Sequence, residues 1–337
     1  MQTWQKLITV AALATIIVIA GTIVYFNNFA KRRLIISTTT SLYDAGLLDQ
    51  IEKDYEAKHP TVDINIISAG TGIAIQHAQN GDADLILVHS PTQEKTFLEQ
   101  GWGLNRKIIA YNYFTIVGPE NDPAGTKGKT TNQALRNIAN YGGNLTDQSG
   151  QTKIFVSRGD SSGTHTKEQA LWKAAGYNYT EISAEPWYAN VGQGMGATLT
   201  ITDQKDAYTL SDIGTFLRFE KDGSISLVAL LTEEKSLLNV YSAIAVNQTV
   251  PANQTIHDRI NYVYAMDFIT YLVTPETQQF IENYGKTDYG QSLFFGAVQP
   301  LKDNAPQPVV GWIQSTAFFN GSECPSQYRN GYSELYT

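Results

Sequence analysis

Short apolar runs of strand length alternate along this chain with stretches whose apolar residues follow the period of a helix. Residues 34–37, 62–67 and 83–88 have the composition of strands, and residues 47–55 place their apolar side chains on one helical stripe. Such alternation is typical of folds in which helices cover a mainly parallel sheet. The sequence therefore predicts the α/β fold class.

Two longer strand candidates, residues 107–117 and 238–246, bracket a central block of the chain. This bracketing predicts a second lobe inserted into the first, with the two long strands crossing between the lobes as a hinge. We therefore expect lobe one to comprise residues 34–116 and 241–299, and lobe two to comprise residues 117–240.

Further strand, helix and loop signals follow the same alternation. We expect a strand at 153–156, helices at 164–175 and 256–273, a further helix starting at Pro275, and polar loops at 120–132 and 142–152. Residues 300–337 are rich in Pro, Asn, Gly and aromatic residues without a clear period. They are predicted to form a C-terminal extension outside both lobes.

The N-terminal part of the chain differs from the rest because residues 7–26 are apolar and carry no charge. A run of this length crosses about 30 Å of hydrocarbon as a helix, whereas the apolar core of a cleaved signal peptide has only about 7–15 residues. We therefore predict a transmembrane helix in residues 1–33, acting as an uncleaved membrane anchor in preference to a removed signal.

The orientation of this anchor is left open by two opposing signals. The basic residues at 31–33 outweigh Lys6 and, taken by themselves, favour a cytoplasmic body. Glycan acceptor sequons favour an external body, and the chain has five of them, at Asn144, Asn178, Asn247, Asn253 and Asn320.

Composition excludes several classes of function. The chain has 24 basic and 32 acidic residues, a net charge of -8, and so lacks the basic surface of a nucleic-acid binder. Its single cysteine, Cys324, excludes an internal disulfide and a cysteine-rich metal site. The five histidines show no metal-ligand spacing, and no glycine-rich nucleotide-binding motif follows the first strand. We therefore expect no bound metal and no cofactor.

Three polar turns carry the chemistry that the sequence offers. Residues 37–41, 68–72 and 157–164 each lie between a predicted strand and a predicted helix. Unpaired N–H groups and the helix dipole favour an anion at such a position, and hydroxyl groups and the Arg158 guanidinium add further donors. Ligands of α/β sheets bind beside the carboxyl ends of strands. One such turn alone would be explained as helix capping.

The chain resembles the solute-binding proteins of tungstate ABC transporters in the first and third of these turns and in four later segments. The matching segments are TTTS at 38–41 with DAGLL at 44–48, SRGDSSGTHTKE at 157–168, GQGMGATL at 192–199, YTLSDIGTFL at 208–217, YSAIAVN at 241–247 and YGQSLF at 289–294. They occur in the order of the family and cover about residues 34–297. The chain departs from the family pattern at Ala45 and Val240, neither of which is an expected anion donor.

The resemblance implies a type II periplasmic-binding-protein fold whose two lobes close on one tetrahedral oxyanion. It implies that lobe one binds the anion through Thr39, Thr40, Ser41 and Thr71, and lobe two through Arg158, Ser162, Gly163 and Thr164. Tungstate would be the ligand, with molybdate as a second ligand, because a fully deprotonated oxyanion only accepts hydrogen bonds. The implied partner is the permease of an ABC transporter. The resemblance also implies that this protein lies at the outer face of the cytoplasmic membrane and that it is not an enzyme.

Three other functions remain open at the level of the sequence. Phosphate or sulfate would be bound by the same fold, and Asp160 would accept the proton that phosphate keeps. A serine hydrolase would use Ser161 of Gly159-Asp160-Ser161-Ser162-Gly163 as its nucleophile, with His257 as the base. A structural or adhesive surface subunit would explain the anchor, the sequons and the aromatic C-terminal residues.

Overall fold

The computed structural model describes residues 4, 14–18, 31–149, 152–231, 234–249 and 259–336. Most of the predicted anchor at 7–26 lies outside these residues, as do Asn253 and His257. Within the described ranges, no helix has both the length and the apolar composition needed to cross a bilayer. The anchor therefore stays a prediction.

The first α/β body contains three parallel strands followed in turn by helices. Its first elements are β1 (Arg32–Thr39), α2 (Thr40–Asp44), α3 (Leu47–Lys58), β2 (Val62–Ala69), α4 (Thr71–Gln79), β3 (Leu85–Val88) and α5 (Pro91–Glu99). β1 lies between β2 and β3 and pairs with both in parallel. The strands predicted at 34–37, 62–67 and 83–88 and the helical stripe at 47–55 are thus confirmed.

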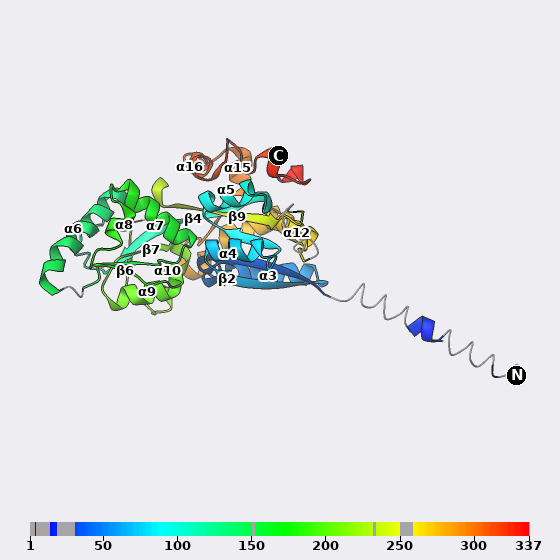
Figure 1. Cartoon of the computed structure of the whole chain (residues 1–337), viewed down its shortest axis with the longest axis horizontal. Helices are drawn as coiled ribbons and strands as arrows, with labels where there is room; N and C mark the ends of the chain where they lie inside the picture. The colour runs from blue at the N-terminus through cyan, green and yellow to red at the C-terminus, as the bar shows by residue number, and fades with distance from the viewer. Residues whose placement is uncertain are drawn as a thin grey trace.

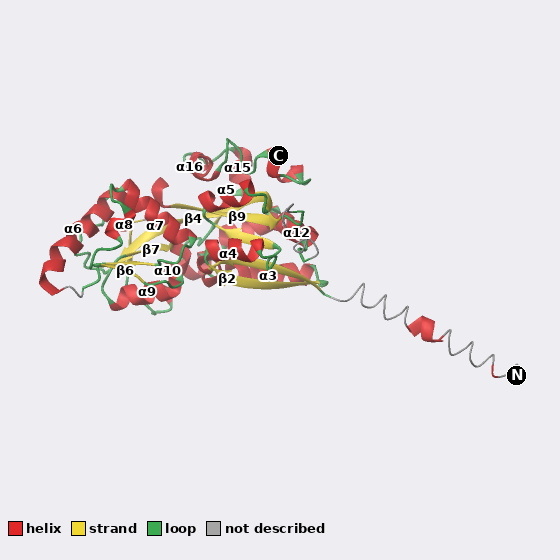
Figure 2. Cartoon of the chain, in the orientation of Figure 1, coloured by secondary structure: helices red, strands yellow, loops and turns green. Residues whose placement is uncertain are grey.

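Two long strands, β4 (Gly103–Gly118) and β9 (Leu238–Val246), run between the first body and a second one (Figures 1 and 2). They pair antiparallel from Gly103 opposite Val246 to Tyr113 opposite Leu238. β3 pairs antiparallel with β9. The prediction of a mainly parallel sheet is therefore wrong: one crossover leaves the first body and the other returns to it, which makes the sheet mixed.

The second body is assembled around the far end of β4, which pairs antiparallel with β7 (Thr209–Asp212) and β8 (Val228–Leu231). Its other elements are α6 (Thr131–Ser149), β5 (Phe155–Ser157), α7 (Gly163–Ala174), α8 (Tyr179–Ile182), β6 (Tyr188–Asn190), α9 (Met195–Gln204), α10 (Ile213–Lys221) and the short 3₁₀ helix η1 (Lys235–Leu237). β5 and β6 form a small parallel sheet.

Each body has its own cluster of buried apolar side chains. One cluster draws mainly on residues 34–110 and 241–294, and another on residues 114–237. This arrangement agrees with an inserted second lobe, although the expected boundaries at 117 and 240 stay a prediction.

After β9 the chain returns to the first body through α12 (Tyr262–Leu272), α13 (Pro275–Asn283), α14 (Lys286–Tyr289) and β10 (Phe295–Gly296). The helix that starts at Pro275 is confirmed. The helix predicted at 256–273 is too long, because residues 259–261 are not helical. The backbone N–H of Asn261 donates to Asp84 Oδ1 at 2.7 Å, which fixes the chain in a non-helical conformation just before Tyr262.

The polar loop predicted at 142–152 is wrong over most of its length, since α6 continues to Ser149. Gly142 and Gly143 both lie within this helix. A side chain at Gly142 would place its Cβ 2.4 Å from the ring of Trp187, so glycine lets this indole pack directly on the helix backbone. Leu145 packs against the same core.

The C-terminal extension is folded and packs on the first body. It contains α15 (Val298–Asp303), α16 (Val309–Ala317) and the 3₁₀ helices η2 (Ser326–Tyr328) and η3 (Ser333–Tyr336). α15 contacts β4 and α16 contacts β9, on the side that also carries α5 (Figure 1). Ile313, Ala317 and Cys324 are fully buried, so the extension contributes to a core instead of forming a loose tail.

A buried ion pair attaches the extension to β4. Lys107 Nζ lies 2.6 Å from Glu323 Oε1, and Glu323 Oε2 accepts from the backbone N–H of Ile108 at 3.1 Å. The neighbouring Arg106 is fully buried, pairs with Glu94 and donates to the Glu323 carbonyl oxygen. These contacts join consecutive residues of β4 to one residue of the extension.

Replacing Glu323 with Gln should lower the free energy of unfolding by about 2–4 kcal/mol, because the Lys107 ammonium then loses its charged partner inside the protein. Urea denaturation measures this change. Glu276→Gln is the matched control, since Glu276 pairs with Lys58 at the surface and should matter by less than about 0.5 kcal/mol. Equal stability of the two variants would contradict the structural role of the Lys107–Glu323 pair.

Candidate functional site

The turn after β1 carries Thr39, Thr40 and Ser41 at the start of α2. Thr39 is the N-cap residue, and its hydroxyl oxygen accepts from the backbone N–H of Leu42 at 3.4 Å. Ser41 Oγ lies 3.3 Å from His89 Nε2. The Thr40 hydroxyl is buried and has no partner among the described residues.

The turn after β2 places Thr71 at the first position of α4, behind Gly70. Thr71 is fully buried, and its hydroxyl also has no partner within the described chain. A Cβ at Gly70 would lie 3.3 Å from Ser162 Cβ, and one at Gly72 would lie 3.4 Å from the Ser161 carbonyl oxygen. The turn of the first body therefore contacts the turn that follows β5 in the second body.

Arg158 follows β5 directly and is almost fully buried, with 1% of its surface exposed. Its Nε and Nη2 donate to Asp160 Oδ2 at 3.1 and 2.5 Å. Asp160 Oδ1 accepts from the backbone N–H of Ser162 at 3.1 Å, so both carboxylate oxygens hold this turn. Nη1 of Arg158 is buried and lacks a partner in the described structure.

The N-terminus of α7 supplies the remaining predicted residues. Ser162 is the N-cap, and its hydroxyl oxygen accepts from the backbone N–H of His165 at 3.1 Å. Gly163 and Thr164 form the first turn, and the Thr164 hydroxyl is buried without a partner among the residues described. Ser162 thus has a capping role in addition to any contact with a ligand.

The glycine-rich segment at 192–198 contains the N-terminus of α9, which lies close to the Thr40 turn. Gly194 is the N-cap of α9, and a Cβ there would lie 3.5 Å from Thr40 Cγ2. The Thr215 hydroxyl of the second body also donates to the Ser41 carbonyl oxygen at 3.3 Å. Contacts of this kind bring the turns of both bodies together.

All eight predicted residues therefore lie where the two bodies meet. Four of their donors are buried and unpartnered within the described ranges: Thr40 Oγ1, Thr71 Oγ1, Thr164 Oγ1 and Arg158 Nη1. Buried polar atoms are normally hydrogen-bonded, because leaving one unpaired costs about 1–3 kcal/mol. None of the described helices α2, α4, α7 and α9 has an acidic residue in its first turn. The arrangement is suited to a ligand that accepts hydrogen bonds and carries negative charge.

Burial controls the ionisation of the groups around this site. Burial, and then the nearby Arg158, lowers the pKa of His89 to about 3, so its imidazole is neutral at pH 7. Burial, with a smaller contribution from the nearby Asp44, raises the pKa of the Asp212 carboxyl to about 6 despite the hydrogen bonds from Thr215 that lower it. The field at the site is therefore set more by Arg158 and by the helix N-termini than by the net charge of the chain.

Sequence reasoning missed two buried polar residues beside the site, His89 and Glu168. His89 directly follows β3, so the available signal was its place after a strand, on the same edge as the other turns. Glu168 lies on the buried face of α7 and accepts a hydrogen bond from the Tyr188 hydroxyl. Its signal was weaker, because a glutamate in a helix is usually exposed.

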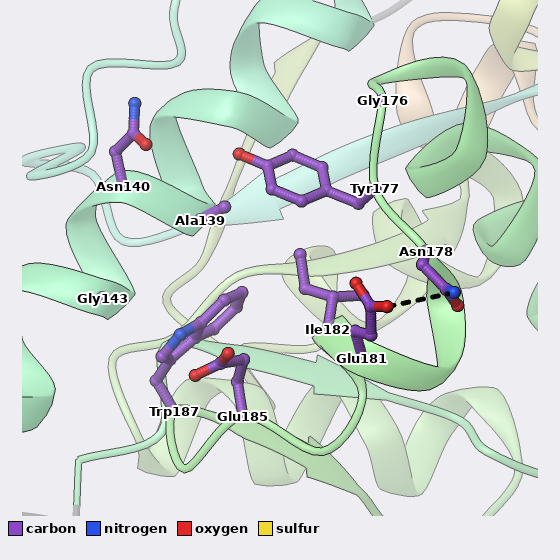
Figure 3. A pocket seen from close by; sticks show the side chains of 10 residues that line it. All are labelled: Ala139, Asn140, Gly143, Gly176, Tyr177, Asn178, Glu181, Ile182, Glu185 and Trp187. Atoms are coloured by element: carbon purple, nitrogen blue, oxygen red, sulfur yellow. Dashed lines mark hydrogen bonds between the residues drawn. The ribbon is translucent and has the colours of Figure 1, made fainter.

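A pocket of about 290 Å³ lies elsewhere in the second body (Figure 3). Tyr177, Glu181, Glu185 and Trp187 line it, and Asn178 Nδ2 donates to Glu181 Oε1 at 3.3 Å. None of the eight predicted residues lines this pocket. Among the described residues, no group of three or more His, Cys, Asp or Glu side chains is arranged to hold a metal ion.

The sequence profile of the PBP superfamily domain matches residues 27–276. A putative ABC transporter anion-binding protein of Haloferax volcanii is 42% identical over 79% of this chain and 72% of its own length. The tungstate-binding protein TupA of Peptoclostridium acidaminophilum is 37% identical over 79% of this chain and 86% of its own.

Among solved structures, this chain is again similar to proteins of tungstate ABC transporters. The tungstate ABC transporter structure from Geobacter sulfurreducens is 41% identical, covers 76% of this chain and 100% of its own, and has a TM-score of 0.64. The tungstate-binding protein TupA from Desulfovibrio alaskensis is 36% identical, covers 78% and 98%, and has a TM-score of 0.61. The chain thus has a periplasmic-binding-protein fold of the α/β class. It belongs to the PBP superfamily and, within it, to the family of tungstate-binding proteins of ABC transporters.

The buried Glu168 predicts a pH dependence of stability. Burial raises its pKa from 4.5 to about 7. Since the folded state prefers the protonated form, this contribution to stability is complete below about pH 4.5 and is lost as the pH rises through 7. Wild-type protein should therefore lose up to about 3 kcal/mol of unfolding free energy between pH 4.5 and 7.5 relative to Glu168→Gln. Urea denaturation across this range tests it, and parallel profiles would refute it.

Proposed function

We propose that this chain captures tungstate, with molybdate as a second ligand, between its two lobes and delivers it to an ABC importer. The observation that carries this proposal is the set of four buried, unpartnered donors on Thr40, Thr71, Arg158 and Thr164. They come from both bodies and converge where the bodies meet. Thr39, Ser41, Ser162 and Gly163 complete the proposed binding site.

The donors fit the chemistry of tungstate. This anion is fully deprotonated near pH 7, so each of its oxygens accepts hydrogen bonds and none donates. Hydroxyl groups rotate to donate, and the unpaired Nη1 of Arg158 adds a charged donor to a buried site.

The state of Asp160 favours tungstate over phosphate. Phosphate keeps a proton at neutral pH and needs an acceptor in its site. Both oxygens of Asp160 already accept hydrogen bonds, from Arg158 and from the Ser162 backbone. Asp160 is therefore assigned the role of orienting Arg158 instead of accepting a ligand proton.

The same turn argues for a binding role in place of a catalytic one. The backbone N–H of Ser161 donates to His165 Nδ1 at 2.9 Å, and His165 Nε2 lies 2.7 Å from the Tyr179 hydroxyl. Both ring nitrogens of His165 are thus engaged away from the Ser161 hydroxyl, so the histidine of this turn is not placed to act as its base. His257, the base expected for a hydrolase, lies outside the described residues. We propose that the protein is not a hydrolase and that Ser161 shapes the turn.

We also propose the division into two moving lobes, with lobe one comprising 34–116 and 241–299 and lobe two comprising 117–240. Asn239 Nδ2 donates to Asn112 Oδ1 at 2.9 Å, which joins the two crossover strands inside the hinge.

Residues 7–26 would hold the protein at the outer face of the cytoplasmic membrane, where the importer receives its ligand. A cleaved segment would release the same body.

Isothermal titration calorimetry with tungstate, molybdate, phosphate and sulfate tests the proposed ligand. We expect tungstate and molybdate to bind with a 1:1 stoichiometry and phosphate and sulfate to bind far more weakly. Binding heat with phosphate alone would favour the alternative of a phosphate-binding protein. The absence of binding heat with all four anions would contradict the proposed function.

Arg158→Ala should weaken tungstate binding at least about 100-fold, because it removes a charged donor from a buried site. Arg158→Lys keeps the charge but loses the planar fork of donors. Its affinity for tungstate should lie between that of Arg158→Ala and that of the wild type. Arg259→Ala is the matched control, since Arg259 is exposed and pairs with Asp82 at the surface. Calorimetry gives the affinities and thermal unfolding verifies the fold; an unchanged affinity for Arg158→Ala would place the site elsewhere.

A further inference from the structure

The His89 side chain lies where the first body, the second body and both crossovers meet. It is 4% exposed. Its ring lies 5.9 Å from the ring of Phe114 on β4 and 5.0 Å from that of Tyr241 on β9, measured between centroids. Its position is therefore fixed by aromatic groups of the hinge.

Gly163 of the second body approaches this ring very closely. A Cβ built at Gly163 would lie 2.7 Å from Cε1, 2.8 Å from Nδ1 and 3.0 Å from Nε2 of His89. Gly163 is the first residue of α7 and has no left-handed backbone conformation. The close approach of the imidazole, and not the backbone, thus requires glycine at this position.

The nitrogens of His89 connect the same contact to the anion donors. Nε2 pairs with Ser41 Oγ at 3.3 Å, while Nδ1 is buried and has no partner within the described chain. The contact between Nε2 and Oγ holds the Ser41 side chain against the ring, and thereby fixes where this donor lies relative to a ligand.

We propose that His89 is a positioning residue of the oxyanion site, on which the N-terminus of α7 docks through Gly163 when the lobes close. This inference rests on the proposed function. The ring sets the separation between the Ser41 turn and the Thr164 turn, and its bond to Ser41 orients one donor. A ligand is enclosed at its full affinity only when Gly163 reaches the ring.

Gly163→Ala tests the docking contact. The added methyl group overlaps three ring atoms, which His89 can relieve only by leaving Ser41. We expect tungstate to bind about 10- to 100-fold more weakly, and the ligand-induced decrease in radius of gyration, measured by small-angle X-ray scattering, to diminish. Gly143→Ala is the matched control, because Gly143 lies on α6 away from the site and a Cβ there would meet no atom within 4 Å.

A double-mutant cycle separates docking from a general loss of structure. In a His89→Ala background the overlap disappears, so adding Gly163→Ala should change the affinity by less than about twofold. His89→Gln retains a polar group that can reach Ser41 and should bind better than His89→Ala. Melting temperatures without ligand should be similar for Gly163→Ala and wild type.

The outcomes are distinguishable. If wild-type protein binds tungstate and Gly163→Ala binds and closes equally well, or if its cost persists without His89, the docking role is overturned and the proposed function stands. If wild-type protein binds none of the tested anions, the proposed function falls and this inference falls with it.

Discussion

The antiparallel pairing of β4 with β9 is the interaction on which the rest of the structure depends. Both strands are almost continuously buried, and each continues from one body into the other. Because the pairing runs from Gly103–Val246 to Tyr113–Leu238, it fixes how the first body presents its turns to the second. The pairing of β4 with β9 thus positions the four helix N-termini that meet at the site, although none of the eight site residues lies on either strand.

When such a site closes, the attraction that its donor groups exert on an anion becomes stronger. A guanidinium, several hydroxyls and helix N-termini would each attract an anion weakly in water, where hydration competes. Brought together and dehydrated, the same groups need an acceptor for every unpaired hydrogen. This requirement reconciles an anion site with a chain whose net charge is -8. Two acidic groups near the site, Asp160 and Asp212, accept hydrogen bonds from Arg158 and from Thr215.

Local patterns predicted the strands of the first body and the donor turns, because apolar period and turn chemistry are properties of a few adjacent residues. They did not predict features that depend on distant partners. The direction of β9 follows from the return of the chain to the first body, and the continuation of α6 through Gly142 depends on the ring of Trp187. The role of His89 required knowing that Gly163, from the other body, lies against it. The C-terminal extension has no clear helical or strand period in its sequence, because contacts with distant residues hold it in place. Glu323, for example, binds Arg106 and Lys107 on β4.

Both described ends of the main folded part belong to the first body. β1 begins at Arg32 beside β2, and the extension closes against β4 through Glu323, with Leu335 buried in the same cluster. Neither of these ends lies in the second body. A tether at the N-terminal end would therefore hold the first body and leave the second body without an attachment of its own.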